Sequence, residues 1–264
     1  MVCKIVNINF EIEKDLVIDK AYEKFSLDSA DTIRVFLKSR SNKLSSHGIE
    51  EYGTVSQKSI LFRLGKDIFI VKEGWRQGEI LYPLYNQNNV DIFFIQIFYT
   101  HAVQRHMIQF HSSLIDYQGH GLMFLGPSGI GKTTQAELWN KYRDALIING
   151  DIVFVQETKE AFLGWGTPWH GSSPYCENTN VPVDALIILK QAPENSIRKL
   201  EGFEKVTAVS NSVFYPRWLE NGMELCLETL DHLLSRLPVY ELSCRPDEEA
   251  VALTEQTIFG GERF

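Results

Sequence analysis

The first hundred residues alternate between apolar and polar positions, and this period of two predicts β-strands with one buried face. The clearest case is a set of four apolar residues at every second position, Val6, Ile8, Phe10 and Ile12. The same reasoning predicts strands at 32–39 and 90–99, and a hairpin at 59–74 that turns at Gly65-Lys66-Asp67. The polar stretch 39–53 is expected to be a surface loop. Residues 1–100 are therefore predicted to form a β-rich N-terminal region.

From residue 101 onward, short apolar runs alternate with segments of helical spacing or composition. A short helix is predicted at 101–110, followed by an antiparallel hairpin at 111–125 that turns within 117–121. Further elements are strands at 145–150, 151–156, 183–190 and 239–244, and helices at 134–141, 227–237 and 246–259. The stretch 161–180 is rich in Gly, Trp, Pro and Ser, which is typical of a long functional loop. Residues 101–264 are thus expected to combine strands and helices.

Residues 121–139, GLMFLGPSGIGKTTQAELW, contain the pattern G-x-x-x-x-G-K-[ST] between an apolar run and a helix-forming segment. Glycines let the backbone curl until successive N–H groups point inward at an anion, and the following helix adds the positive end of its dipole. Lys132 would reach the β and γ phosphates of a nucleotide, and the Thr133 hydroxyl would bind Mg²⁺. The residues expected to contact the nucleotide are Gly126, Ser128, Gly129, Ile130, Gly131, Lys132, Thr133 and Thr134.

Composition narrows the class of protein. The 264 residues, 44% hydrophobic and 23% charged, suffice for one large domain or two small ones with a well-buried core. A net charge of -8 argues against a protein whose main partner is nucleic acid. The four cysteines have no CxxC or zinc-like spacing, so reduced thiols in the cytoplasm are expected. The charged N-terminus does not resemble a signal peptide and the apolar run 92–99 is too short to span a bilayer, so no membrane partner is expected.

Magnesium-nucleotide chemistry usually needs a carboxylate at the end of a strand beside the phosphate-binding loop. Asp151 follows the apolar run 145–148 and is the best candidate, although Asn149-Gly150-Asp151 is also a turn signal. Asp184 precedes its strand and is expected on the surface. His111 begins the strand paired with the one that feeds the loop, so it could lie near Asp151, hold the carboxylate and tune its basicity. The predicted catalytic residues are Asp151, His111 and Lys132, and the predicted metal ligands are Thr133 and Asp151.

These residues resemble a known family. HSSLIDYQGHGLMFLGPSGIGKTTQAELW (111–139) and LIINGD (146–151) are similar to the catalytic domain of HPr kinase/phosphorylase and its shorter relatives, which share a P-loop kinase fold with ATP-dependent phosphoenolpyruvate carboxykinase. The resemblance implies an α/β P-loop catalytic domain over 101–264, with a mixed sheet and flanking helices, preceded by the β-rich region. Carried over, His111 matches the family histidine, Thr133 the metal-binding hydroxyl and Asp151 one of the family acids.

The chain also departs from the HPr kinase pattern. It has Gly150-Asp151 where the family has two adjacent aspartates. Either Asp151 alone would serve both the metal and the acceptor hydroxyl, or another carboxylate would enter the site. The family's metal-assisting Glu has no clean match, and Glu160 and Glu177 are the candidate substitutes. The NGD and GTPW elements resemble instead HPr-kinase-related proteins, some of which modify ribosomally made peptides while others act on free serine. The N-terminal hundred residues do not resemble those of HPr kinase, which argues against HPr as substrate.

The sequence hypothesis is a cytoplasmic, ATP/Mg²⁺-dependent kinase that transfers the γ-phosphate to a hydroxyl, preferably a Ser-type hydroxyl of a peptide or protein. Two alternatives stay open: a kinase for a small hydroxylated metabolite, and a non-catalytic nucleotide-binding scaffold. Arg198 and Arg217 are candidates for offsetting charge on the transferred phosphoryl group. Trp165, Trp169 and His170 are candidates for the acceptor site, with packing of the loop as the other role of the tryptophans. The choice among ATP, GTP and pyrophosphate stays open, as does the oligomeric state, a homo-oligomer included.

Overall fold

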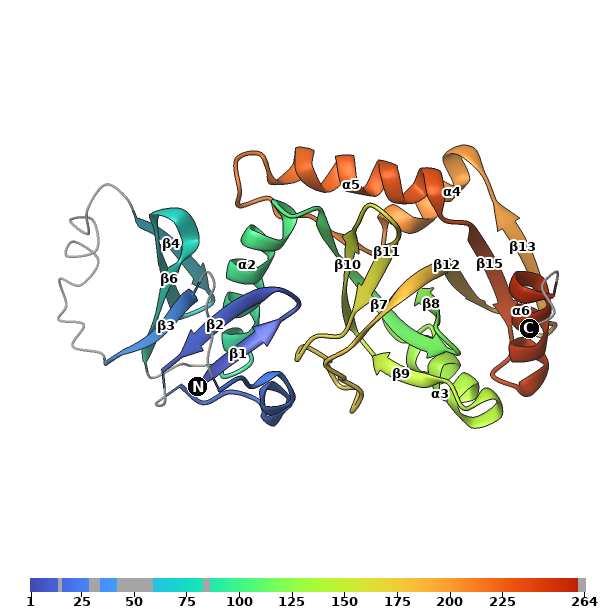
Figure 1. The fold of residues 1–264 in the computed structure, drawn as a ribbon, viewed down its shortest axis with the longest axis horizontal. Helices are drawn as coiled ribbons and strands as arrows, with labels where there is room; N and C mark the ends of the chain where they lie inside the picture. Colours follow the sequence, from blue (N-terminus) through green and yellow to red (C-terminus); the bar gives the residue numbers. More distant parts are fainter. Residues whose placement is uncertain (14–15, 29–33, 42–58, 83–85, 261–264) are drawn as a thin grey trace. The chain divides into compact units, whose positions relative to one another are not determined.

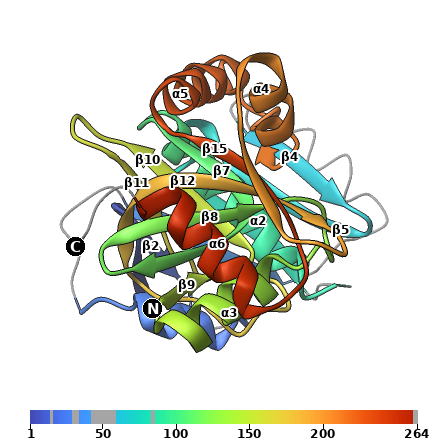
Figure 2. The ribbon, with the colours of Figure 1, turned by 90° about the vertical axis from the view of Figure 1, so that its right-hand side faces the viewer.

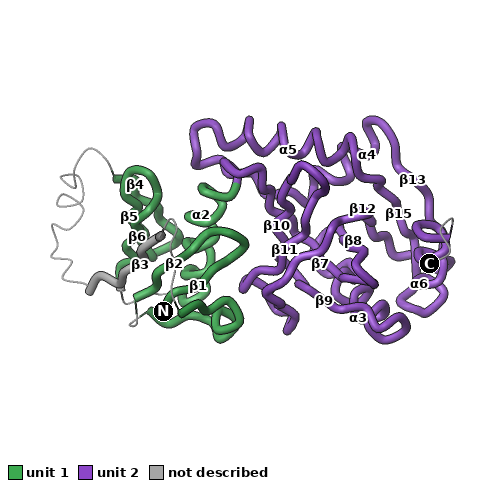
Figure 3. The backbone as a smooth tube through the Cα atoms, in the orientation of Figure 1, with its two compact units in different colours: residues 1–102 green, residues 103–264 purple. Residues whose placement is uncertain are grey.

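The computed structural model describes residues 1–13, 16–28, 34–41, 59–82 and 86–260. The chain divides into two compact units, residues 1–102 and residues 103–264 (Figure 3); the sequence had placed this division at residue 100. Together they make a mixed α/β protein with a β-rich N-terminal part and a large mixed sheet flanked by helices. Among the helices in the described ranges, none is both long enough and apolar enough to cross a membrane.

The N-terminal unit is built on a six-stranded sheet in the order β1-β2-β3-β6-β5-β4. Its elements are β1 (Val2–Ile5), β2 (Ile8–Ile12), η1 (Lys20–Phe25), β3 (Arg34–Ser41), β4 (Ser59–Leu64), β5 (Asp67–Lys72), η2 (Glu73–Trp75) and β6 (Gln77–Tyr82). The predicted strand at 6–12 is present as β2. The predicted hairpin at 59–74 is present as β4 and β5, which turn at Gly65-Lys66. Most of the loop expected at 39–53 lies outside the described residues.

The apolar segment 90–99 is a helix, so the strand prediction there was wrong. Helix α2 (Asn89–Val103) buries three phenylalanines against the sheet of the N-terminal unit. Phe93 stacks on Phe69 of β5, with ring centroids 4.9 Å apart, and Phe94 and Phe98 both contact Phe10 of β2. A short apolar run fits a buried strand and a buried helix equally well, and here contacts distant in sequence decide. The helix predicted at 101–110 was also wrong, because α2 ends at Val103 and β7 begins at Met107.

The second unit contains a nine-stranded mixed sheet with the main order β11-β10-β7-β8-β12-β15-β13. Its strands are β7 (Met107–Tyr117), β8 (His120–Leu125), β9 (Leu146–Asn149), β10 (Ile152–Glu157), β11 (Phe162–Trp165), β12 (Asn180–Gln191), β13 (Ser196–Leu200), β14 (Val213–Phe214) and β15 (Val239–Cys244). Strands β7 and β8 form the predicted antiparallel hairpin, whereas β8, β12 and β15 run parallel. Because β11 pairs with both β10 and β12, the strands β7, β8, β12, β11 and β10 form a closed ring of pairings.

Four helices cover the two faces of this sheet. Helices α3 (Lys132–Arg143) and α6 (Glu248–Phe259) lie on one face, and α4 (Gly202–Ser210) and α5 (Gly222–Arg236) lie on the other (Figures 1 and 2). Under α3 and α6 the core includes Phe124, Trp139 and Ile187, all fully buried. Burial of a large apolar side chain contributes roughly 1.5–3 kcal/mol. This packing fixes the end of β8 and the start of α3, and with them the loop between the two elements.

Candidate functional site

The loop between β8 and α3, residues 126–131, is here called the glycine loop. Gly126, Gly129 and Gly131 adopt φ angles of 143°, 79° and 112°, a region in which residues with a Cβ are strained. Gly131 is also the N-cap of α3, so the first N–H groups of the helix open toward the loop. The order of strand, glycine loop and helix is the one the sequence predicted. A backbone of this kind offers its amides and a helix N-terminus to an anion.

Lys132, the first residue of α3, is folded back onto the glycine loop. Only 6% of the residue is exposed. Its Nζ donates hydrogen bonds to the carbonyl oxygens of Gly126, at 3.1 Å, and Pro127, at 3.2 Å. Burial lowers the pKa of the Lys132 ammonium from its usual value, and the Asp151 carboxylate partly opposes this shift. The ammonium is therefore held by neutral carbonyls, and an anion in the loop would stabilise its charge.

The structure brings His111 and Asp151 together. His111 lies on β7 opposite Ile152, the first residue of β10, in the antiparallel register. Its Nε2 is 2.9 Å from Oδ1 of Asp151, and each side chain is 28% exposed. The backbone N–H of Ser112 also donates to the carbonyl oxygen of Asp151, at 2.9 Å. A carboxylate held on one oxygen by an imidazole, and still reached by water, can orient a hydroxyl or accept its proton.

The strand tip that carries Asp151 is organised by Asn149, to which the sequence had assigned no role beyond the turn. Asn149 is fully buried. Its Oδ1 accepts hydrogen bonds from the backbone N–H groups of Asp151 and Ile152, at 2.9 and 3.0 Å. Its Nδ2 donates to the carbonyl oxygens of Thr167 and Trp169, at 2.9 and 3.3 Å. The Asn-Gly turn signal is therefore real, and the same turn directs Asp151 while fastening the loop that follows β11.

That loop, residues 166–179, packs so closely on the strand tip that two positions admit no side chain. A Cβ at Gly150 would lie 1.9 Å from Oγ and 2.5 Å from Cβ of Ser173. A Cβ at Gly171 would lie 2.4 Å from Oδ2 of Asp151. Ser173 thus takes the space that a second acidic side chain at position 150 would need. This contact is a physical reason why position 150 holds a glycine.

The glycine loop, the strand tip and the 166–179 loop enclose a cavity of about 380 Å³, here called the phosphate cavity. Lys132, Thr133, His111 and Asp151 all line it. Oγ1 of Thr133 donates to the Gly150 carbonyl at 3.3 Å, a long bond that leaves the hydroxyl free to take another partner. The predicted metal-binding and catalytic residues and six of the eight predicted nucleotide contacts therefore line one space, whereas Gly126 and Ile130 do not line it.

Several candidates from the sequence do not line this cavity. Within the described residues its lining does not include Glu160, Glu177, Arg198, Arg217, Trp165 or Trp169. The Arg198 guanidinium instead bonds to Glu204 and Glu241. Trp169 is 3% exposed and contacts the ring of Phe154, which is the packing role considered for it. His170 does line the cavity, and its Nδ1 is hydrogen-bonded to the carbonyl oxygen of Ser173.

Sequence reasoning missed one carboxylate that lines the cavity. Glu137 lies four residues after Thr133 on α3, so both side chains occupy the same face of the helix. Its Oε1 accepts a hydrogen bond from the Tyr175 hydroxyl at 3.2 Å, which ties α3 to the 166–179 loop. The spacing from Thr133 was the available signal. Ser172 and Ser173, which also line the cavity, were hidden in the composition of the long loop.

The oxygen ligands in the phosphate cavity suit a magnesium ion that arrives with a nucleotide. Over the part of the chain that is described, no three or more His, Cys, Asp or Glu side chains gather to hold a metal by themselves. Mg²⁺ usually takes one or two protein ligands and completes its shell with phosphate oxygens and water. Thr133 and Asp151, which line the cavity together with Lys132, match that requirement.

Fold and site define an α/β protein whose glycine loop faces a carboxylate–histidine pair. Residues 87–245, more than half of the chain, match the family model described as "SynChlorMet cassette protein ScmC". The chain therefore belongs to the ScmC family. A search among curated proteins found no match. Among solved structures, the HPr(Ser) kinase/phosphatase from Coxiella burnetii is similar with a TM-score of 0.37 and 9% identity, over 59% of this chain and 99% of that chain. So distant a likeness says nothing about activity, for which the site itself is the basis.

Proposed function

We propose that the protein is an ATP/Mg²⁺-dependent kinase that transfers the γ-phosphate to a hydroxyl group, with a Ser-type hydroxyl of a peptide or protein as the acceptor. One observation carries the proposal: the His111–Asp151 pair opens onto the same cavity as Lys132 and Thr133. A protein that only senses a nucleotide needs the anion-binding residues and at most a carboxylate for the metal ion. A carboxylate held ready beside them is what phosphoryl transfer requires in addition.

In this mechanism the amides of the glycine loop and Lys132 hold the β and γ phosphates. Thr133 and Asp151 would hold the magnesium ion, which supplies neutralisation of phosphate charge. Asp151 orients the acceptor hydroxyl and takes up its proton as the new oxygen–phosphorus bond forms and the bond to the leaving ADP oxygen breaks. His111, bonded to Oδ1 of Asp151, fixes the direction in which the carboxylate points.

A peptide acceptor is supported by a further cavity that borders the glycine loop. This space, about 670 Å³ and here called the α4 cavity, meets the loop at Gly126 and Pro127 and extends beneath α4. Its lining is largely apolar and includes Leu200 and Phe203, a phenylalanine that is 85% exposed. An exposed aromatic side chain is of the type that is enriched where a partner chain binds.

The proposal is tested with γ-labelled ATP, Mg²⁺ and two kinds of acceptor, serine-containing peptides and free serine. We expect transfer to peptide, lost in Lys132→Ala and in Asp151→Asn. Matched controls are Lys141→Ala, an exposed lysine on the same helix, and Asp184→Asn, an aspartate also paired with a histidine but outside the phosphate cavity. Both controls should retain transfer. Transfer to free serine alone would point to the metabolite kinase, and ATP binding without transfer to any acceptor or to water would point to the scaffold.

A further inference from the structure

The wall of the phosphate cavity contains hydroxyl groups of the protein itself. They belong to five side chains, namely Ser128, Thr133, Thr134, Ser172 and Ser173. The proposed acceptor of the γ-phosphate is a Ser-type hydroxyl, so each of these groups is a candidate acceptor within its own chain. Their positions in the wall, and the contacts that they already make, decide which of them can serve.

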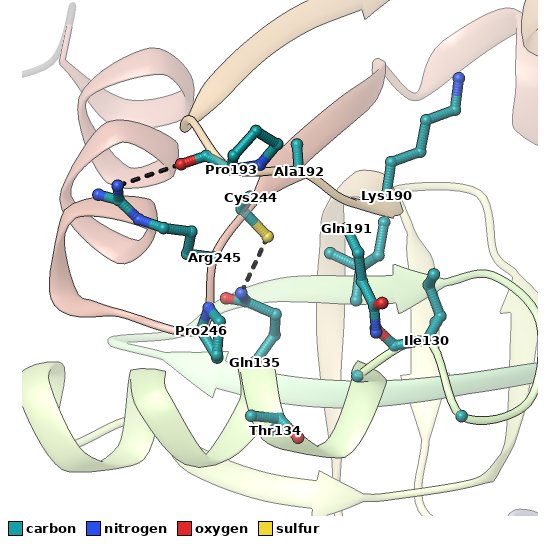
Figure 4. Close-up of a pocket in the computed structure, with 13 residues that line it drawn as sticks. Ile130, Thr134, Gln135, Lys190, Gln191, Ala192, Pro193, Cys244, Arg245 and Pro246 are labelled. Carbon is teal, nitrogen blue, oxygen red and sulfur yellow. Dashed lines mark hydrogen bonds between the residues drawn. The ribbon is translucent and has the colours of Figure 1, made fainter.

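Three of the hydroxyls lie on the side of the phosphate donor. Ser128 belongs to the glycine loop, and Thr133 and Thr134 belong to the first turn of α3. Thr134 also borders a third cavity, of about 520 Å³, which reaches the segments 191–193 and 244–246 (Figure 4). In phosphoryl transfer the attacking and leaving oxygens lie roughly in line, on opposite sides of the phosphorus. Hydroxyls beside the backbone that holds the leaving phosphate are therefore badly placed for attack.

The other two hydroxyls come from a different wall, the 166–179 loop. Within this loop the backbone N–H of Ser173 donates to the carbonyl oxygen of His170 at 3.0 Å, which closes a tight four-residue turn. The His170 ring also donates, from Nδ1, to the carbonyl oxygen of Ser173. Gly171 has a φ angle of 57°, which glycine adopts without strain. Ser172 is the other central residue of the turn, and it is exposed.

This turn lies against the carboxylate oxygen that His111 leaves free. The His111 Nε2 is bonded to Oδ1 of Asp151. The second oxygen, Oδ2, is so close to Gly171 that a Cβ at that glycine would lie 2.4 Å from it. The oxygen available to accept a proton is therefore beside the residue that directly precedes Ser172. A hydroxyl on this wall approaches from the side of the base.

Ser172 and Ser173 differ in whether their hydroxyls are available. Ser173 is 7% exposed, its Oγ accepts a hydrogen bond from the Tyr175 N–H at 3.3 Å, and it packs against Gly150. Among the described residues, the Ser172 hydroxyl has no hydrogen-bond partner. Rotation about its Cα–Cβ bond therefore breaks no bond to the protein. Ser172 alone combines an available hydroxyl with a place beside the Asp151 carboxylate.

We infer that Ser172 is a self-phosphorylation site, whose hydroxyl takes the γ-phosphoryl group of the ATP bound in the same chain. The Ser172 Oγ attacks the γ phosphorus, the bond from that phosphorus to the ADP oxygen breaks, and the hydroxyl proton passes to Oδ2 of Asp151. This inference rests on the proposed function. A phosphoserine carries a charge of about -1.5 to -2 and would stand beside the Asp151 carboxylate, where an external acceptor has to bind. Phosphorylation of Ser172 therefore lowers transfer to peptides.

The site is tested by incubating the protein with γ-labelled ATP and Mg²⁺ without peptide, and by mapping the label with fragmentation mass spectrometry. We expect the label on Ser172, and expect it to be lost in Ser172→Ala and in Asp151→Asn. Ser172→Thr supplies a new hydroxyl at the same position and should still be labelled there. The matched control is Ser235→Ala, which removes an exposed serine of α5 outside the phosphate cavity and should keep the label. Thermal unfolding shows that each variant is folded.

The outcomes separate this inference from the proposed function. Transfer to peptide with no label on the protein, or with the label on a residue other than Ser172, refutes the self-phosphorylation site and leaves the kinase in place. Absence of transfer to the protein and to every peptide refutes both. Since donor and acceptor belong to one chain, the fraction labelled per unit time should not change on dilution of the protein. A fraction that falls in proportion to concentration would mean transfer between chains and would overturn the inference.

The effect of the modification is measured on protein first phosphorylated with unlabelled ATP and then freed of nucleotide. Given labelled ATP and peptide, this protein should label the peptide about tenfold more slowly than protein incubated without ATP, because the phosphoserine repels a second anion and occupies the acceptor position. Equal rates would show that phosphorylation of Ser172 does not block the acceptor position.

Discussion

The two ends of the β7–β8 hairpin carry the same pair of side chains. At the end beside the glycine loop, His111 and Asp151 are 2.9 Å apart, and both side chains are 28% exposed. At the turn end, His120 and Asp184 are 3.0 Å apart, with side chains 30% and 38% exposed. Residue type, distance and exposure are thus nearly equal at the two ends.

What differs is the surroundings of each pair. His111 and Asp151 line the phosphate cavity with Lys132 and Thr133, at the carboxyl end of β8. At the turn end, the His120 ring instead contacts Phe259 of α6, with centroids 5.2 Å apart, and Asp184 lies before the part of β12 that pairs with β15. A histidine–aspartate pair is therefore not a functional signal by itself. Its position at the strand ends, beside a helix N-terminus, is what distinguishes the His111–Asp151 pair as a candidate site.

The largest expected effect is a difference in stability between two variants, one at the Asn149 turn beside the glycine loop and one at the turn of the β7–β8 hairpin. Asn149→Ala would leave the partly buried N–H groups of Asp151 and Ile152 and the buried carbonyl of Thr167 without a side-chain partner, and we expect the free energy of unfolding to fall by about 3 kcal/mol. Asp116→Ala at the turn end removes one exposed hydrogen bond from the Gly119 N–H, and should cost at most about 1 kcal/mol. Urea unfolding of both variants measures the difference. Equal losses would show that Asn149 does not organise the site.

The second prediction replaces each of the two histidines with glutamine, in separate variants. His111→Gln should lower the rate of phosphoryl transfer about 10- to 100-fold, because Asp151 loses the group that orients it. His120→Gln should leave the rate within about twofold, because its carboxylate partner lies outside the phosphate cavity. Single-turnover rates at saturating ATP make the comparison independent of nucleotide affinity. Similar losses in the two variants would remove the distinction between the ends.

The site follows from the sequence more directly than the N-terminal unit does. The hairpin and the nearness of His111 to Asp151 depend on strand periodicity and on register around a short turn, which act over few residues. The helix at 89–103 could not be predicted, because burial against distant strands decides between helix and strand for an apolar run. The bonds of Asn149 to Thr167 and Trp169, and the packing of Ser173 on Gly150, likewise join segments that no local pattern relates.

A smaller effect is expected where Ser173 packs against Gly150, near the end of the hairpin beside the glycine loop. Gly150→Ala forces its Cβ against Ser173, so we expect a loss of about 1–2 kcal/mol in stability and weaker ATP binding. Ser173→Gly removes both atoms that the new Cβ would meet. The double variant should therefore recover most of the stability lost in Gly150→Ala. If the double variant is no more stable than Gly150→Ala, contact with Ser173 is not what keeps position 150 free of a side chain.

The smallest effect concerns the charge on Lys132. Burial lowers the pKa of its ammonium in the folded protein below the usual value of 10.5 that it has in the unfolded chain. Between these two pKa values the unfolded state holds more protons, so the contribution of Lys132 to stability rises with pH in that window. Below the folded-state pKa the cost of burying the ammonium is fully present. In urea titrations, Lys132→Met should therefore gain stability relative to wild-type protein at neutral pH, and this advantage should shrink as the pH approaches 10.5. Bound tripolyphosphate favours the charged ammonium. With this ligand present, the stability difference between Lys132→Met and wild-type protein should therefore no longer decrease as the pH approaches 10.5. An advantage that grows with pH in the unliganded protein would mean that burial does not control the charge of this lysine.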